Sequence, residues 1–252
     1  MDYLAVIALA LSAGIVGGAM NALAGGGTFA TLPALILLGL PANIANATSN
    51  VALLPGAAAS SWAYRSELGP IGGVGWRTLL GITFVAGLLG SLLLVLTPGD
   101  AFDFIIPWLL LIAFIMIAFG PRASSWLHAR VTIGRRTLLV AQAIMGLYGG
   151  YFGGGVGLMV TATYGLLAHI APRDVFAIRT FMLTVANLAA MTIFIAFDFI
   201  DWRACLPMLV GSILGGWVGA HIGKRLQPLF VRRMTLLVAG AVTLTFFLRT
   251  YG

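Results

Sequence analysis

Ala24-Gly25-Gly26-Gly27-Thr28 is the stretch that decides the fold, and Gly153-Gly154-Gly155-Val156 repeats its pattern about half a chain length later. Each triple glycine follows a long apolar segment and precedes a short one. Because glycine weakens a helix by about 1 kcal/mol per residue, three in a row should break it. A break at membrane depth is tolerated only where protein or a watery cavity surrounds it. Breaks at matching places in two halves are typical of a transporter's binding site.

The composition is that of a membrane protein. The chain is 60% hydrophobic and 8% charged, with a mean hydropathy of +1.04, whereas a soluble domain carries roughly 25% charged residues. We therefore predict an all-α polytopic integral membrane protein with the lipid bilayer as its partner. The net charge of +7 does not indicate nucleic acid, because the basic residues lie between hydrophobic segments and form no single stripe. Residues 4–23 lack a basic leader and a convincing cleavage site, so we interpret them as a retained helix.

About ten hydrophobic segments can be marked, and a full span needs about 20 residues. They cover residues 4–23, 28–40, 45–64, 78–97 and 104–119, then 137–152, 156–169, 175–197, 204–223 and 234–248. The segments after the triple glycines are short, and we expect each to cross partway as a hairpin with its predecessor. The chain then has about 8 to 10 transmembrane segments.

The charges fix the orientation. With the N-terminus outside, all 14 basic residues except Arg203 and Arg249 fall on the cytoplasmic side, as the positive-inside rule requires. The outer side also receives Asp2, Asp100, Asp103, Asp198 and Asp201. We predict a multi-pass protein of the bacterial inner membrane with both termini in the periplasm.

The two halves correspond to each other. Pro41 pairs with Pro172, and Trp76-Arg77 pairs with Trp202-Arg203. Each half holds an odd number of segments, so the second half starts on the opposite side from the first, which makes an inverted repeat. We predict a first membrane repeat over residues 1–120, a basic cytoplasmic linker over 121–136 and a second membrane repeat over 137–252.

The triple glycines are candidate anion ligands. A glycine loop that feeds a helix N-terminus offers free amides and the positive end of the helix dipole. The candidate substrate-binding residues in the breaks are Gly25, Gly26, Gly27, Thr28, Gly153, Gly154 and Gly155. The alternative is close helix packing, which membrane helices achieve with small residues. We favour packing for the glycines outside the triplets, namely Gly14, Gly17, Gly18, Gly87, Gly90, Gly215, Gly216 and Gly219.

Polar side chains follow each short segment. Thr48, Ser49 and Asn50 could donate hydrogen bonds to an oxyanion, or could cap the next helix, and the two roles are compatible. Arg179 and Thr180 occupy the related place in the second half, where arginine is either an anion ligand or a snorkelling anchor. Weaker candidates are Asn21, Asn46 and Asn187. Gln142 could equally hold helices together.

Several chemistries are missing. No apolar segment carries a central Asp or Glu of the kind used in proton relays. The sequence also lacks a Walker-type loop, HExxH and CxxC motifs, and a credible Ser–His–Asp set. These absences argue against an enzyme and against ATP-driven transport by this chain alone. We expect neither a cofactor nor a metal site.

Two motifs resemble a known family. Asn21-Ala-Leu-Ala-Gly-Gly-Gly-Thr28, followed by Pro33, Gly39 and Ala45-Asn-Ala-Thr-Ser-Asn50, resembles the first repeat of the sulfite exporter TauE/SafE family, and Gly146-Leu-Tyr-Gly-Gly-Tyr-Phe-Gly-Gly-Gly-Val-Gly157 resembles its second. The resemblance covers nearly the whole chain. It implies a permease, since many members are associated with export or uptake of sulfite, sulfoacetate or other small organic anions. Where the family often has lysine after an asparagine-containing stretch, this chain has Arg179, which keeps the charge but changes its geometry.

We therefore expect a permease that moves a small, sulfur-containing or other organic anion by alternating access. Its midplane site would join both triplets with residues 48–50 and 179–180. The alternatives are a membrane scaffold or partner subunit without transport, an anion channel, and a permease for cations or neutral solutes. The oligomeric state is open, a homodimer included.

Overall fold

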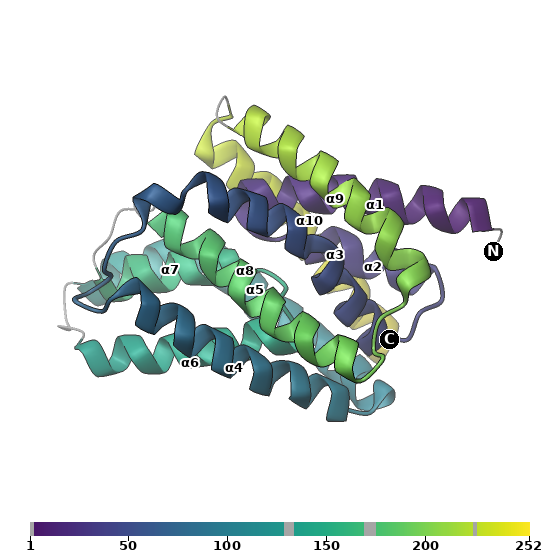
Figure 1. The fold of residues 1–252 in the computed structure, drawn as a ribbon, viewed down its shortest axis with the longest axis horizontal. Helices are drawn as coiled ribbons and strands as arrows, with labels where there is room; N and C mark the ends of the chain where they lie inside the picture. The colour runs from purple at the N-terminus through teal and green to yellow at the C-terminus, as the bar shows by residue number, and fades with distance from the viewer. Residues whose placement is uncertain (1–2, 129–133, 169–174, 224–225) are drawn as a thin grey trace.

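The chain folds into a bundle of helices (Figure 1). The computed structural model describes residues 3–128, 134–168, 175–223 and 226–252. Its elements are α1 (Tyr3–Ala24), α2 (Thr28–Leu37), α3 (Ala42–Ala63), the short 3-10 helix η1 (Arg65–Glu67), α4 (Trp76–Leu96), α5 (Gly99–His128), α6 (Arg135–Tyr151), α7 (Val156–Ala168), α8 (Val175–Ala196), α9 (Trp202–Gly223) and α10 (Pro228–Tyr251). Over the described residues the prediction of an all-α protein is confirmed.

The outer surface of the bundle is apolar. Large side chains such as Leu89, Trp217 and Leu244 are more than half exposed, which in water would be unfavourable and in lipid is the expected arrangement. Six of the described helices are long and apolar enough to cross a membrane. They are Tyr3–Ala24, Trp76–Leu96, Gly99–Phe119, Ala177–Ala196, Trp202–Ile222 and Leu229–Tyr251. The chain is therefore a multi-pass membrane protein.

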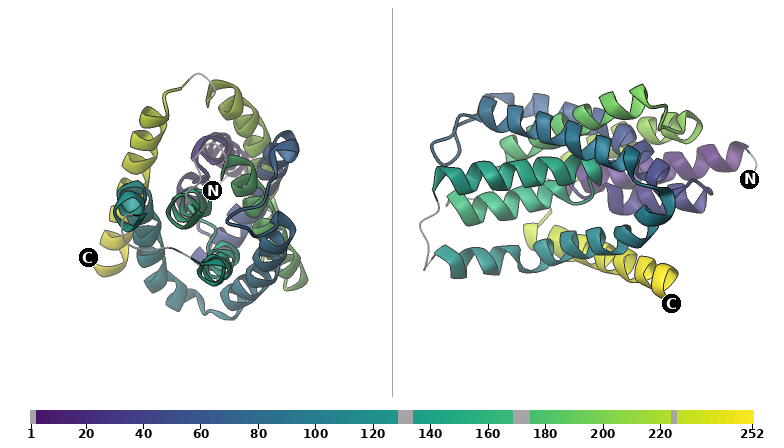
Figure 2. Two further views of the ribbon diagram at one scale, coloured as in Figure 1. Left: turned by 90° about the vertical axis from the view of Figure 1, so that its left-hand side faces the viewer. Right: turned by 90° about the horizontal axis from the view of Figure 1, so that it is seen from below.

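Two short helices follow the triple glycines. Helices α2 and α7 have 10 and 13 residues, which gives lengths of about 15 to 20 Å against a hydrocarbon core of about 30 Å. Both termini lie at one end of the bundle, and α1 runs inward from that end (Figure 1; Figure 2, right). Helices α6 and α7 pack together and enter from the opposite end. Each short helix packs against the helix before it, so α1–α2 and α6–α7 form the predicted hairpins.

The two halves pack reciprocally. Helix α1 packs along α9, and α4 packs along α6. Helix α3 contacts α9, α4 contacts α8, and α3 and α8 contact each other. If α1, α3 and α4 are exchanged with α6, α8 and α9, this set of contacts maps onto itself. The pattern is what an inverted repeat would produce. Helix α5 extends to His128, so the first part of the predicted linker 121–136 is helical.

Glycines allow the paired helices to approach closely. A methyl group built on Gly14 or Gly18 of α1 would overlap the backbone of Met208 or Ser212 in α9. The same holds for Gly90 of α4 against Leu147 of α6. Close approach also confirms the packing interpretation for Gly17, Gly87, Gly215 and Gly219. A methyl on Gly216 would stand an ordinary 3.7 Å from Gly56, so that glycine is not required for close packing.

Candidate functional site

Each triple glycine ends one helix and begins the next. Gly25 and Gly153 both have left-handed backbones, with φ of 75° and 76°, a conformation that glycine adopts at little cost. The Gly25 amide donates to the Asn21 carbonyl oxygen at 2.8 Å, and the Gly153 amide donates to that of Tyr148 at 3.2 Å. The chain thus leaves α1 and α6 through glycine C-caps and re-enters helix at Thr28 and Val156.

The two breaks meet. A methyl group on Gly25 would stand 2.8 Å from the Gly157 Cα, and one on Gly157 would stand 3.0 Å from the Gly25 Cα. Gly157 is the second residue of α7, and Gly25 lies three residues before α2. The N-termini of α2 and α7 are therefore close together. The first amides of a helix have no acceptor within it and carry the positive end of its dipole, so two such ends together favour an anion.

Arg179 lies beside this meeting point. Its side chain is only 5% exposed, and its Cδ would be 3.5 Å from a methyl group on Gly157. It also interacts with Tyr64 at the end of α3. Arg179 lies on the first turns of α8, within the span Ala177–Ala196. A cationic side chain is thus buried beside the point where the two breaks meet.

The polar cluster of α3 is helical throughout, so the capping interpretation was wrong. Helix α3 begins at Ala42 with Pro41 as its N-cap and no side-chain cap bond. Asn46 and Asn50 lie one turn apart and face the second break. The Asn46 Nδ2 donates to the Tyr151 carbonyl oxygen at 3.0 Å, and the Asn50 Nδ2 donates to that of Phe152 at 3.3 Å.

Ser49 and Thr48 point in different directions. The Ser49 and Thr31 hydroxyls are 2.5 Å apart, and the Thr31 hydroxyl also donates to the Gly27 carbonyl oxygen at 3.2 Å. Ser49 is thereby linked to the first break. Thr48 instead accepts a hydrogen bond from the Asp201 amide at 3.0 Å, which ties α3 to the beginning of α9. The Thr48 hydroxyl therefore serves the packing of α3 against α9.

The remaining candidates are buried but differ in their partners. The Thr180 hydroxyl donates to the Ala177 carbonyl oxygen of its own helix at 2.8 Å, so its first role is within α8. Asn187 is 5% exposed and lies two turns further along α8. Thr28 is buried as the first residue of α2. The Asn21 Cβ would be 3.0 Å from a methyl group on Gly27, so Asn21 packs against the first break.

Sequence reasoning missed two residues that hold the breaks. One is Thr31, one turn into α2. The other is Tyr148, whose hydroxyl lies within hydrogen-bond distance of two carbonyl oxygens, those of Leu109 at 3.0 Å and Gly154 at 3.1 Å. Tyr148 stands inside the second glycine motif, which could have indicated its role. Gln142 does hold helices together, since it accepts a hydrogen bond from the Tyr164 hydroxyl at 2.5 Å.

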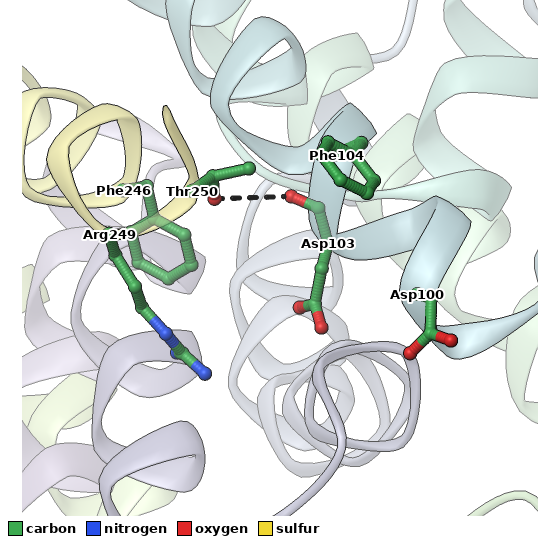
Figure 3. A pocket seen from close by; sticks show the side chains of 6 residues that line it. All are labelled: Asp100, Asp103, Phe104, Phe246, Arg249 and Thr250. Carbon is green, nitrogen blue, oxygen red and sulfur yellow. Dashed lines mark hydrogen bonds between the residues drawn. The ribbon is translucent and has the colours of Figure 1, made fainter. Parts of the chain in front are cut away.

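A surface pocket lies elsewhere, between the start of α5 and the end of α10 (Figure 3). Its volume is about 410 Å³, and it is lined by Asp100, Asp103, Phe104, Phe246, Arg249 and Thr250. None of the candidate site residues lines it. The pocket brings together Asp100, Asp103 and Arg249, which the charge pattern had placed on one side of the membrane. Within the described residues no group of three His, Cys, Asp or Glu side chains could hold a metal ion.

Comparison with known proteins agrees with this arrangement. The sulfite exporter TauE/SafE family profile matches residues 10–246. The chain belongs to this family. It is 28% identical over 235 residues to a probable membrane transporter protein, ORF9, of a Sinorhizobium species, which covers 90% of this chain and 88% of that protein. It is 27% identical over 240 residues to a probable membrane transporter of Haemophilus influenzae, covering 94% and 93%. The probable membrane transporter YfcA of Escherichia coli is 24% identical over 236 residues, covering 93% and 87%. The family and these relatives support a membrane transporter.

Proposed function

We propose that this chain is a bacterial inner-membrane permease that binds a small anion where the N-termini of α2 and α7 meet beside Arg179. The observation that carries the proposal is the contact between Gly25 and Gly157, next to a buried guanidinium. Two helix N-termini and one cation supply amide and guanidinium donors without any carboxylate to repel the ligand. The family's description makes sulfite, sulfoacetate or a related organosulfonate the first anions to test, followed by other small organic anions.

The same geometry suggests how access could alternate. The α1–α2 hairpin enters from one end of the bundle, and the α6–α7 hairpin enters from the other. Their meeting point is therefore reached past a different hairpin from each side. We propose alternating access by an inverted repeat of residues 1–120 and 137–252, joined by the linker 121–136, with both termini in the periplasm.

Anion-dependent stabilisation of the purified protein tests the function. Thermal unfolding would be followed against sulfite, thiosulfate, sulfoacetate, taurine, sulfate and small carboxylates. An anion at a hundred times its dissociation constant should stabilise the fold by about 2.7 kcal/mol. We expect a saturable shift with at least one sulfur oxyanion or organic anion, and its loss in Arg179→Ala. A non-transporting scaffold would show no shift with any anion.

Counterflow distinguishes a carrier from a channel. In vesicles preloaded with unlabelled anion, a carrier drives the uptake of labelled anion. The uptake rate saturates as the anion concentration rises. A channel gives conductance that follows voltage and shows no counterflow. We expect saturable counterflow in proteoliposomes. Conductance without counterflow would show that the protein is a channel and does not work by alternating access.

A further inference from the structure

Asn46 carries a buried oxygen that the anion site does not use. The residue is 0% exposed, and among the residues that the structure describes its Oδ1 has no hydrogen-bond partner. The orientation of this amide is fixed by its neighbour, because the Tyr151 carbonyl can only accept and so must face the Nδ2, at 3.0 Å. The atom left over is therefore an acceptor. An acceptor repels an anion, so this oxygen does not suit the anion that the sequence suggested for Asn46.

Two backbone acceptors lie at the second break, beside the Asn46 and Asn50 amides. The carbonyl oxygens of Tyr151 and Phe152 lie at the second break, where each takes one amide hydrogen from Asn46 or Asn50. A carbonyl oxygen has two lone pairs, so each can accept again. Tyr151 is the last residue of α6, so the negative end of the α6 dipole points here.

We propose that Asn46 Oδ1, with the carbonyl oxygens of Tyr151 and Phe152, forms a binding site for Na⁺. Hard cations prefer oxygen ligands, and Ca²⁺ and Mg²⁺ sites usually include carboxylates. The three oxygens assigned here are all neutral, which favours a monovalent ion. Unwound carbonyls and half-helix C-termini are where secondary transporters hold Na⁺. The buried Asn46 oxygen indicates where such a Na⁺ site would lie in this chain.

The site has a consequence for transport that rests on the proposed function. The second break also supplies the N-terminus of α7, so the cation and the anion would occupy neighbouring parts of one structure. One Na⁺ carried with one monovalent anion adds no net charge. Anion flux would then depend on the Na⁺ gradient and respond little to membrane potential.

Thermal unfolding of the purified full chain in NaCl against choline chloride, without substrate anion, tests the site. We expect Na⁺ to raise the melting temperature saturably in the natural chain. Asn46→Leu should raise the half-saturating Na⁺ concentration about tenfold or more, since even outer-shell partners of metal ligands are worth that much. Gln142→Leu is the matched control, because it removes another buried amide, bonded to Tyr164, and should keep the Na⁺ response. A natural chain that responds equally to Na⁺ and choline would overturn the proposal, as would an unchanged response in Asn46→Leu.

Asn46→Asp keeps the shape of the side chain and adds a negative charge. It should lower the half-saturating Na⁺ concentration, and an unchanged or higher value would contradict the site even if Asn46→Leu failed to fold. Repeating the anion series in choline salts separates the two proposals. Anion stabilisation that is indifferent to Na⁺ would refute the Na⁺ site and leave the permease. A Na⁺ response lost in Asn46→Leu, without any anion response, would refute the anion site and leave the cation site.

Discussion

Gly25 combines two requirements that only glycine meets. Its φ of 75° is left-handed, and its Cα faces Gly157 with no room for a methyl group between them. The left-handed conformation costs other residues roughly 1 to 2 kcal/mol. The overlap adds to this, because the atom it meets is backbone and cannot turn aside. The close meeting of the two breaks therefore depends on this residue.

Gly25→Ala should lower the melting temperature more than Gly39→Ala does. Gly39 has a φ of 90° but nothing within 4 Å of the added methyl group, so it shares the strain without the overlap. We expect Gly25→Ala to lose anion stabilisation as well, since α2 and α7 would be pushed apart. Melting curves of both variants measure the difference, and equal losses would show that the breaks do not depend on this contact.

Residue types were more predictable than their partners. The glycines and Arg179 could be selected because glycine breaks helices and buried arginine is costly. The opposite directions of Thr48 and Ser49 could not be predicted. They depend on how α3 is rotated against α9 and α2, which is set by packing between residues far apart in the chain.

At the scale of the element, α1 is paired with α9 and α4 with α6. Both pairs use glycine to bring backbones together, and each joins the first half of the chain to the second. Dispersion between closely packed backbones is the main attraction available to helices in lipid. A motion that rocked one half rigidly against the other would have to separate both pairs. We therefore expect the α1–α9 pair to move as a unit against the α4–α6 pair, which keeps both close contacts.

Two glycines of α4 test this packing. A methyl group on Gly90 would overlap the Leu147 carbonyl and stand 2.8 Å from the Tyr151 nitrogen, whereas Gly81 has nothing within 4 Å. Alanine improves helix propensity by about 1 kcal/mol at either position. Gly81→Ala should therefore leave stability equal or higher, and Gly90→Ala should reduce it. Unfolding in detergent compares them, and similar stability would exclude a close α4–α6 contact.

Helix number was predictable because apolar runs and charged loops alternate in a membrane chain. Helix ends were less so. Helix α3 begins at Ala42, and α5 extends over Gly99–His128, beyond the predicted 104–119. Polar residues such as Asn43 and Asn46 lie inside α3, since protein and not lipid surrounds them. Hydropathy alone cannot distinguish these two surroundings.

At the scale of the whole molecule, charge separates the two ends. Asp100, Asp103 and Arg249 line one pocket at the end of the bundle that holds both termini. Arg65 follows α3, which runs to the opposite end. The positive-inside rule then predicts periplasmic termini.

Thiol labelling of single introduced cysteines tests the orientation of the chain in the membrane. Cys205 is buried, so it gives little background. Gly252→Cys should react with an impermeant thiol reagent in intact cells, and Ser66→Cys should react only after permeabilisation. Both positions are exposed. The reverse labelling pattern would show that the termini lie in the cytoplasm, contrary to this orientation.

The meeting of the halves was only partly predictable. The matching glycine motifs indicated two related breaks. Bonds such as that from Asn46 to Tyr151 join residues more than a hundred positions apart, and no local pattern specifies such a pair. The Na⁺ site follows from that bond and could not have been inferred from the sequence.

The most direct test of the central claim is anion counterflow into proteoliposomes, using the anion that stabilises the protein best. Arg179→Gln removes the buried charge, and Arg65→Gln is the control, because Arg65 is exposed and its guanidinium contacts Trp62, away from both breaks. Losing a charged hydrogen bond should weaken apparent affinity about ten- to hundredfold in Arg179→Gln. Arg65→Gln should behave like the natural chain. Equal saturable counterflow in both variants, at equal expression, would contradict an anion site beside Arg179.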